Sequence, residues 1–526
     1  MKVAVIGAGP AGLTSAKQAQ ALGHEVRIYE KYGQLGGIWN PESGGAYPSV
    51  KMQSSKLSFH FSDFPPPSHL SDFPALPEVY GYLLGYAKHF GIFDRIRFSE
   101  PVTQIRKEKG RWLVSSKADP GKPRTEAFDW VMVANGELWH SHIPNAEKLA
   151  QLRQIQVKTA KDYYDPKVYS GQRVLVVGGG VSGADIAAEI ADVAQVHWSV
   201  RSKRLFLPRL VGSAYNDALS SYVGRVALQA LPYGQFKEWL TDLMPDYMAQ
   251  YEASGLLPTN TVNNAIHVND RIIPCVAEGR VQVRGAFEAV EIERDGTEQV
   301  HFQDGSRAMY DSIIFCTGYQ LPDYSFISDF DAKKLYEHFV YLEDPTLTII
   351  NTPAHTEAFG TACPYFEMIA AYGLKVMSGK LRLPSQAEME AWCQQHLGLG
   401  MATTGHLHRY YYDCWLETIR LGLMCGQVPN PEKHFNEYWQ LVSGNLSPSN
   451  LSRANRAQEN FHQSPTQWDA ALDLPSLKLR LLKSLPKEAV GRLVEQGQIS
   501  VDTYSALQSS TLEPLPPELP YPKPPF

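Results

Sequence analysis

The 526-residue sequence contains only six cysteines, and none of them forms a CxxC pair. Their scatter indicates neither a zinc site nor a disulfide framework, and it favours reduced thiols in a cytoplasmic protein. No apolar run reaches the roughly 18 residues of a membrane-spanning helix, so no transmembrane segment is expected. Basic residues do not outnumber acidic ones, since the formal net charge is −6, and nothing indicates a broad surface for nucleic acid.

The first thirty residues have the pattern of a dinucleotide-binding unit. A β-branched run at residues 3–6 precedes Gly7, Gly9 and Gly12, which form a GxGxxG motif. A helix is expected over residues 11–22 and a second strand over 24–29, ending at Glu30. Such glycines allow a tight turn and close approach to a pyrophosphate at the helix N-terminus, and an acid at this place can bind ribose hydroxyls.

A second unit repeats the pattern later in the chain. A strand at residues 173–177 is followed by Gly178, Gly180 and Gly183, a helix over 181–193 and a strand over 196–200. This second strand ends in a basic stretch that contains Arg201 and Lys203, with no acid. Because a basic side chain can pair with a 2′-phosphate, the sequence predicts NADPH here; the alternative is a solvated basic turn.

Two more apolar runs, at residues 129–136 and 311–319, end in small residues and glycine and read as buried strands. The second run follows the second glycine motif, so we expect the first domain to be interrupted and completed later. Two dinucleotide sites suggest hydride transfer from NADPH to a flavin. Beyond residue 395, helices are expected over 410–423 and 477–497, and the last 14 residues are rich in proline.

These residues resemble the flavin-containing monooxygenases, which are class B flavoprotein monooxygenases. The resemblance covers roughly residues 1–390 and rests on several motifs: GAGPAG at 7–12, GGIW at 36–39, YPSV at 47–50, FSDFP at 61–65, GGGVSG at 178–183, CTGY at 316–319 and LRLPS at 381–385.

The expected fold is α/β, with two nested Rossmann-type domains and a mainly helical C-terminal extension. The predicted domains are an FAD-binding part at 1–165, an inserted NADPH-binding domain at 166–310, the completion of the FAD domain at 311–394, a helical region at 395–512 and a proline-rich tail at 513–526.

The resemblance implies an NADPH-dependent enzyme that transfers one oxygen atom from O₂ to nitrogen, sulfur or carbon of a small organic substrate, through a C4a-hydroperoxide of the flavin. Three alternatives stay open: a Baeyer–Villiger or N-hydroxylating relative, an NADPH oxidase or flavin reductase, and a non-catalytic dinucleotide-binding scaffold. A metal site is not expected, and a homodimer is left open.

The resemblance also assigns residues to the cofactors. It assigns Gly7, Gly9, Gly12 and Glu30 to the adenosine and pyrophosphate of FAD, and Gly37 and Trp39 to the path toward its ribityl chain and ring. It assigns Gly178, Gly180, Ser182, Gly183 and Arg201 to NADPH. Further cofactor-binding candidates, not divided between the two cofactors, are Pro10, Ala11, Lys31, Met52, Gln53, Val102, Ala134, Gly136, Lys203, Thr317 and Gly318.

Two positions are candidates for catalysis. Gln53 stands where the family often has an asparagine that faces the flavin and NADP⁺, and it carries the same amide on a longer stem. Asp63 could orient the nicotinamide, or it could be a loop cap or salt bridge. The family fingerprint FxGxxxHxxxY is degenerate over residues 153–163, where Tyr163 fits and Thr159 replaces the histidine.

Overall fold

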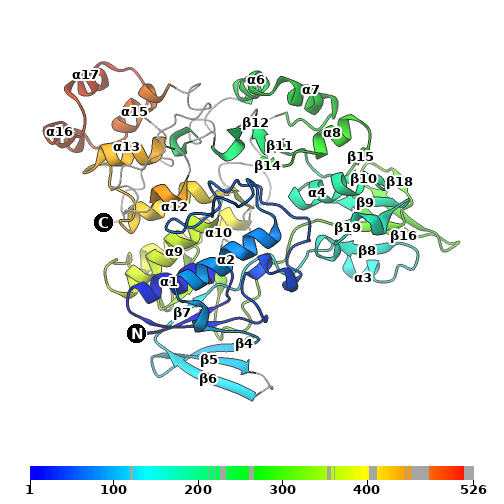
Figure 1. The fold of residues 1–526 in the computed structure, drawn as a ribbon, viewed down its shortest axis with the longest axis horizontal. Coiled ribbons are helices and arrows are strands. Elements are labelled where there is room, and N and C mark those ends of the chain that lie inside the picture. The colour runs from blue at the N-terminus through cyan, green and yellow to red at the C-terminus, as the bar shows by residue number, and fades with distance from the viewer. Residues whose placement is uncertain are drawn as a thin grey trace.

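The computed structural model describes residues 1–118, 122–211, 214–218, 221–224, 233–259, 266–351, 357–359, 362–401, 411–444, 447–451 and 473–514. Two parallel-rich sheets organise this part of the chain, each with its own glycine turn (Figure 1). The sheet with β9 and β10 lies at the right of the view, and the last helices lie at the upper left.

The first sheet is built around β1, whose residues Val3 and Val5 are fully buried. Its strands follow the order β20-β21-β22-β7-β1-β2-β3, and the five from β22 to β3 are parallel. Their bounds are β20 Leu335–Tyr336, β21 Val340–Tyr341, β22 Leu347–Ile349, β7 Trp130–Val133, β1 Lys2–Ile6, β2 Glu25–Tyr29 and β3 Ile96–Arg97. Because β22 comes from late in the chain, the first domain is completed after the second, as predicted.

The second sheet contains five parallel strands in the order β15-β10-β9-β19-β8. Their bounds are β15 Val281–Arg284, β10 Gln195–Ser199, β9 Arg173–Val177, β19 Ser312–Phe315 and β8 Gln156–Thr159. The central strand β9 is buried on both faces, which explains its run of valine and leucine.

Two strands, β8 and β19, lie within the residue ranges predicted for the FAD domain but belong to the second sheet. β8 precedes the expected boundary at residue 165 and β19 follows the boundary at 311, yet both belong to the second sheet. The nesting holds, but the second unit begins before residue 156 and extends through β19. Short strands such as β8 and β19 fit either sheet, so only strand pairing assigns them.

Helices cover both sheets. α1 (Pro10–Ala21) packs against α9 (Ala362–Met377) beside the first sheet, and α4 (Val181–Ile190) packs against β9, β10 and α8 (Ile272–Ala277) in the second. The other helices of the two nucleotide units and their insert are α2 Leu76–His89, α3 Ala146–Leu149, α6 Tyr233–Leu243 and α7 Pro245–Ala253.

Smaller sheets complete the two units. They comprise the meander β4 Val102–Glu108, β5 Arg111–Ala118 and β6 Lys122–Phe128, the meander β16 Phe287–Ile292, β17 Glu298–Phe302 and β18 Arg307–Ala308, and the pairs β11 Leu205–Leu207 with β14 Ile266–Val268, β12 Leu210–Val211 with β13 Ala214–Tyr215, and β23 Glu357–Phe359 with β24 Tyr411–Asp413.

The C-terminal region is mainly helical, as expected, but two predicted helices differ in their bounds. Residues 411–413 form β24 and the helix starts only at α12 (Cys414–Met424), while the helix over 477–497 is divided at Pro486 into α15 (Leu474–Lys483) and α16 (Lys487–Glu495). The remaining helices are α10 Gln386–Met401, α13 Phe435–Ser443 and α17 Val501–Ser509. Most of the proline-rich tail, from residue 515, lies outside the described residues.

Three aromatic residues of this region are part of the core. Trp415, Phe435 and Tyr438 are buried in the same apolar cluster as Val3 and Val5 of β1. α12 packs on α9, which in turn packs on α1, so the extension is continuous with the first nucleotide unit. Within the described ranges, no helix is both long and apolar enough to span a bilayer.

Candidate functional site

The first glycine turn joins β1 to α1 in a tightly packed form. Gly7 has φ of +109°, and a Cβ there would lie 2.2 Å from the carbonyl oxygen of Ala134. A Cβ at Gly12 would lie 1.9 Å from the carbonyl oxygen of Gly7. Neither position has room for a side chain, so both glycines are needed for the close packing of strand and helix. Pro10 and Ala11 form the first turn of α1, where Pro10 removes an N–H that no helical bond would use.

Gly9 differs from Gly7 and Gly12 because it caps α1 and its Cβ position is open. A Cβ at Gly9 would make only ordinary contact, at 3.5 Å from Cα of Gly37, and its backbone is extended. The segment with Gly37 and Trp39 lies against the turn, since Gly36 N–H donates to the Ala8 carbonyl at 2.8 Å. The structure therefore brings Gly37, a predicted cofactor-binding residue, to the first turn.

Glu30 is fixed at the edge of the same turn. The carboxylate is buried and accepts from Ala8 N–H at 2.8 Å through Oε2 and from Tyr32 N–H at 3.0 Å through Oε1. Burial raises the pKa of Glu30, and these two backbone donors oppose that shift. A carboxylate accepts about four hydrogen bonds, so Glu30 retains capacity to accept from a ribose hydroxyl. This acceptor and the open position at Gly9 fit the adenosine diphosphate part of FAD.

An aromatic and cationic cluster adjoins Glu30. The Lys31 ammonium lies 4.1 Å from the centroid of the Trp139 ring, and Lys161 lies 5.2 Å from it. Burial lowers the pKa of Lys31, and the charge of Lys161 lowers it further. Trp139 is held by its own Nε1–H, which donates to the Asn135 carbonyl at 2.8 Å. The sequence predicted Lys31 but missed Trp139, because no motif links a tryptophan to a strand that lies far away in the chain.

Three other predicted cofactor-binding residues, Ala134, Gly136 and Val102, lie near these groups. Ala134 N–H donates to the Ile6 carbonyl at 2.8 Å, and Gly136 N–H donates to Asn351 Oδ1 at 3.0 Å. Val102 begins β4 shortly after Glu100, whose N–H donates to the Glu30 carbonyl at 2.9 Å. All three therefore lie around the carboxyl ends of β1, β2 and β7, where ligands of parallel sheets bind.

The second turn repeats the arrangement of the first. A Cβ at Gly178 would lie 2.2 Å from the Cys316 carbonyl oxygen, and one at Gly183 would lie 2.0 Å from the Gly178 carbonyl oxygen. Gly180 caps α4 and faces open space, with no atom within 4 Å of its Cβ position. Thr317 and Gly318 follow β19 beside this turn, and Ser182 lies in the first turn of α4. These residues fit the pyrophosphate of NADPH.

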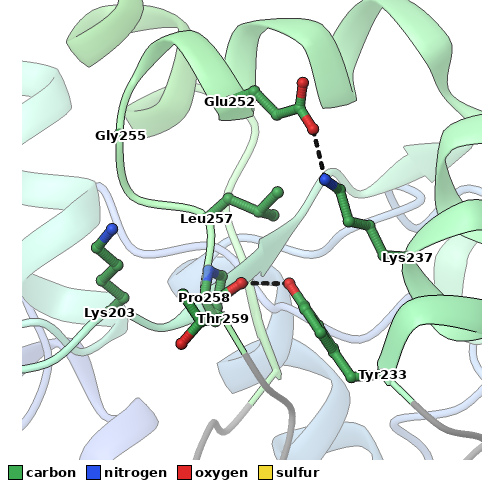
Figure 2. A pocket seen from close by; sticks show the side chains of 8 residues that line it. All are labelled: Lys203, Tyr233, Lys237, Glu252, Gly255, Leu257, Pro258 and Thr259. Carbon is green, nitrogen blue, oxygen red and sulfur yellow. Dashed lines mark hydrogen bonds and ion pairs between the residues drawn. The ribbon is translucent and has the colours of Figure 1, made fainter.

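The basic residues after β10 face solvent. Arg201 and Lys203 are exposed, and Lys203 lines a pocket of about 350 Å³ together with residues of α6, α7 and the loop that follows (Figure 2). In this pocket Lys237 forms an ion pair with Glu252 at 2.6 Å, and the Tyr233 hydroxyl donates to the Pro258 carbonyl. The Lys237 charge is therefore balanced within the pocket, whereas Arg201 and Lys203 can approach a 2′-phosphate.

The segment of residues 47–53 joins the two nucleotide units. The Tyr47 hydroxyl donates to Asp185 of α4 at 2.8 Å, and Ser49 Oγ donates to Glu189 at 2.8 Å. Gln53 is half-buried, and its Oε1 accepts from the N–H of Val268 in β14 at 3.3 Å. The predicted catalytic residue Gln53 thus lies where the FAD side meets the inserted domain.

Met52, the neighbour of Gln53, is held from both sides of the same junction. Its N–H donates to the Pro74 carbonyl at 2.9 Å, and its own carbonyl accepts from Arg209 Nε at 3.2 Å. Arg209 belongs to the inserted segment and also pairs with Asp270 at 2.6 Å. The sequence missed Arg209 and Asp185, because their roles depend on contacts between distant segments.

Asp63, for which a catalytic role and a salt bridge were both predicted, makes an ion pair in the structure. It forms an ion pair with Lys17, and its side chain is 34% exposed. Lys17 is two turns along α1 from Gly9, on the order of 10 Å at 1.5 Å per residue. The geometry supports the salt-bridge interpretation of Asp63, and we do not place Asp63 in the reaction.

A half-buried acid that the sequence did not indicate, Asp217, contacts the segment after Gln53. Asp217 Oδ2 accepts from Ser55 N–H at 2.6 Å and from the Ser58 hydroxyl. Its other oxygen, Oδ1, is buried and has no hydrogen-bond partner in the described part of the chain. Burial raises the pKa of Asp217, and the serine donors oppose that shift. Asp217 therefore fixes the 53–58 segment against the inserted domain.

A buried acid, Glu367 of α9, makes the stability of the protein depend on pH. It accepts from Ser62 N–H at 2.9 Å and Ser62 Oγ at 3.1 Å, and burial raises its pKa to about 8 from 4.5. Between these values the folded chain retains a proton that the unfolded chain has lost. The free energy of unfolding should therefore fall as pH rises, by about 1.4 kcal/mol per pH unit from this group.

Replacing Glu367 by glutamine tests this linkage. Urea unfolding of Glu367→Gln between pH 5 and pH 8 should show a flatter dependence on pH than the parent chain. Glu488→Gln, at an exposed position of α16, is the control and should leave the slope as it is. An unchanged slope in Glu367→Gln would mean that Glu367 titrates normally.

Two nested Rossmann units, each with an open glycine at a helix N-terminus, define an oxidoreductase that binds two dinucleotides. A family model described as Flavin-binding monooxygenase-like matches residues 1–398. A curated relative, Flavin-containing monooxygenase 5 from Cavia porcellus, is 32% identical over 423 residues, covering 74% of this chain and 76% of the relative. The chain belongs to the flavin-binding monooxygenase-like family.

Solved structures show the same fold at lower identity. Tmm from Pelagibacter sp. strain HTCC7211 superposes with a TM-score of 0.57 and 19% identity, covering 90% of this chain and 98% of that chain. An epsilon-caprolactone-bound cyclohexanone monooxygenase superposes with a TM-score of 0.55 and 16% identity, covering 78% and 94%.

Family membership confirms several predictions. The protein is a flavin monooxygenase that depends on FAD and NADPH and acts on a small molecule and O₂. The α/β fold with two Rossmann-type domains is also confirmed.

Proposed function

We propose that the chain inserts one oxygen atom from O₂ into nitrogen, sulfur or carbon of a small organic substrate, at the junction between its two nucleotide units. One observation carries this proposal. The 47–53 segment, which follows the first glycine turn, is hydrogen-bonded to α4 and β14 of the inserted domain through Tyr47, Ser49 and Gln53. The junction therefore lies between the places that fit FAD and NADPH.

The residues of this site hold, orient and shield the reactants. When bound, NADPH supplies the reducing equivalents and FAD the chemistry that activates oxygen. Gln53 Oε1 is committed to Val268 N–H, which leaves the amide Nε2 as a donor toward a ligand at the junction. Asp217 and Arg209 fix the backbone on either side of Gln53, so the position of the amide is set by two anchors.

Arg201→Ala tests the coenzyme assignment. The guanidinium should pair with the 2′-phosphate, and a charge-assisted contact contributes about 1.5–3 kcal/mol, or one to two decades in affinity. The variant should require roughly ten to a hundred times more NADPH for anaerobic flavin reduction and should respond to NADH as the parent does. An equal loss with both coenzymes would remove Arg201 from the 2′-phosphate site.

A substrate panel under ¹⁸O₂ tests the proposed reaction and its alternatives. The purified protein is incubated with NADPH and a thioether, a tertiary amine or a cyclic ketone, and the masses of the products are measured by mass spectrometry. A labelled S-oxide or N-oxide supports oxygenation of sulfur or nitrogen, and a labelled lactone assigns the Baeyer–Villiger alternative. If NADPH is consumed and peroxide is released without a labelled product, the protein is an NADPH oxidase. If NADPH does not bleach the flavin, the protein is a non-catalytic scaffold.

We also propose that the protein works in the cytoplasm. The support is that the sequence has no CxxC pair and that Cys275, Cys393 and Cys425 are buried thiols. Burial raises the pKa of Cys425 to about 11, which keeps it as an unreactive thiol. Cell fractionation with antibody detection tests the location, and the native mass in solution tests whether the chain forms a homodimer.

A further inference from the structure

Helix α4 carries an acid that links the two nucleotide units. Asp185 lies two residues after Gly183, the last glycine of the motif, and its carboxylate accepts a hydrogen bond from each of the two units. Oδ2 accepts from the hydroxyl of Tyr47, which belongs to the FAD side, at 2.8 Å. Oδ1 accepts from the amide of Asn269, which belongs to the inserted segment. Tyr47 is 5% exposed and Asn269 is 2% exposed, so both contacts are shielded from water.

The orientation of Asn269 is fixed independently of Asp185. Its Oδ1 accepts from Arg271 N–H at 2.8 Å and from Ile272 N–H at 2.7 Å, at the start of α8. The amide Nδ2 must therefore face Asp185 as a donor. Because the Tyr47 hydroxyl also donates, both oxygens of Asp185 act as acceptors, which is the arrangement of an ionised carboxylate.

The Asp185 contacts lead directly to Gln53. Asn269 follows Val268, whose N–H donates to Gln53 Oε1. Asn269 is also anchored by its own N–H, which donates to the Leu207 carbonyl at 2.9 Å. A continuous path thus runs from α4 through Asp185, Asn269 and Val268 to Gln53, and a second contact runs from Asp185 to Tyr47.

We propose that Asp185 is a positioning residue that sets the distance between the NADPH-binding helix α4 and the flavin side of the junction. This inference rests on the proposed function, because it concerns hydride delivery at the same junction. α4 begins at Gly180, so a shift of Asp185 moves the helix end that holds the pyrophosphate. A displacement on the order of 1 Å can slow a reaction about a hundredfold when the geometry is tight.

The test is the rate of flavin reduction, measured anaerobically by stopped flow with the FAD-loaded full chain. Asp185→Asn keeps the volume of the side chain but offers one oxygen to two donors, so either Tyr47 or Asn269 loses its acceptor. We expect the rate at saturating NADPH to fall about ten- to a hundredfold, while the NADPH concentration for half-saturation changes less than threefold. FAD content and the rate of reduction by dithionite should be those of the parent.

Two further variants separate positioning from a general structural role. Tyr47→Phe removes one hydroxyl and should slow reduction in the same way, and the double variant should be no slower than the slower single variant. Asp192→Asn is the control: this exposed acid pairs with Arg271 at 2.7 Å and Arg280 at 3.3 Å within the inserted domain, and it should leave the rate unchanged.

Two results would overturn the proposal. One is a parent-like limiting rate in both Asp185→Asn and Tyr47→Phe. The other is a loss that appears only as weaker NADPH binding, with additive effects in the double variant. The measurement uses neither O₂ nor an organic substrate, so its outcome does not depend on whether the oxygenation proposed above takes place.

Discussion

Gly9→Val is expected to give a folded chain that purifies without bound FAD and does not oxidise NADPH. The backbone at Gly9 has φ of −79° and ψ of −176°, a conformation that valine adopts without strain. Its Cβ fits at 3.5 Å from Gly37, so the added methyl groups project into the open side of the turn, where the pyrophosphate of FAD would lie. The flavin-to-protein absorbance ratio measures the loss, and far-ultraviolet circular dichroism checks the fold.

The second turn supplies a matched control for this variant. Gly180 caps α4 with nearly the same backbone angles, φ of −88° and ψ of −174°, and its Cβ position has no atom within 4 Å. Gly180→Val should retain yellow FAD but should not be reduced by NADPH, although dithionite should still reduce it. A Gly9→Val protein with full flavin, or a Gly180→Val protein without flavin, would contradict the assignment of the two turns.

Gln53→Ala is expected to separate NADPH consumption from product formation. The truncation removes the amide that lies at the junction and is held by Val268. Anaerobic flavin reduction by NADPH should stay near that of the parent, while peroxide released per NADPH rises and product per NADPH falls, on the order of tenfold or more. Loss of an oriented group at a reacting centre has effects of this size. Parallel assays of NADPH, peroxide and product measure the ratio.

Gln53→Asn is the informative companion variant. Asparagine keeps the donor and acceptor but retracts them by one methylene, so it tests whether the position of the amide or only its presence matters. A coupling ratio between those of the parent and Gln53→Ala would show that position matters. Parent-like coupling in Gln53→Ala would remove Gln53 from the site and would leave its contact with Val268 as a structural one.

The local parts of the site could be predicted from the sequence, because a glycine turn contains its own chemistry. Gly12 meets the carbonyl of Gly7 within the same strand–turn–helix unit, so the spacing identifies it, whereas the close contact of Gly7 is with Ala134 at the end of β7. Glu30 and Arg201 follow the second strands of the two units, which makes their places predictable within each unit. Gln53 was placed by resemblance, and the structure adds its contact with β14.

The sequence by itself determined the two nucleotide turns and the nested order of the chain. It also determined that an acid follows the second strand of the first unit, whereas a basic stretch follows the second strand of the second unit. Those features depend on neighbours within about thirty residues, or on the order of motifs along the chain. Only the tertiary structure decided that β8 and β19 belong to the second sheet, since strand pairing is long-range. Likewise, it paired Asp63 with Lys17 and joined Tyr47 to Asp185, because a carboxylate shows its role only through the donors that folding brings to it.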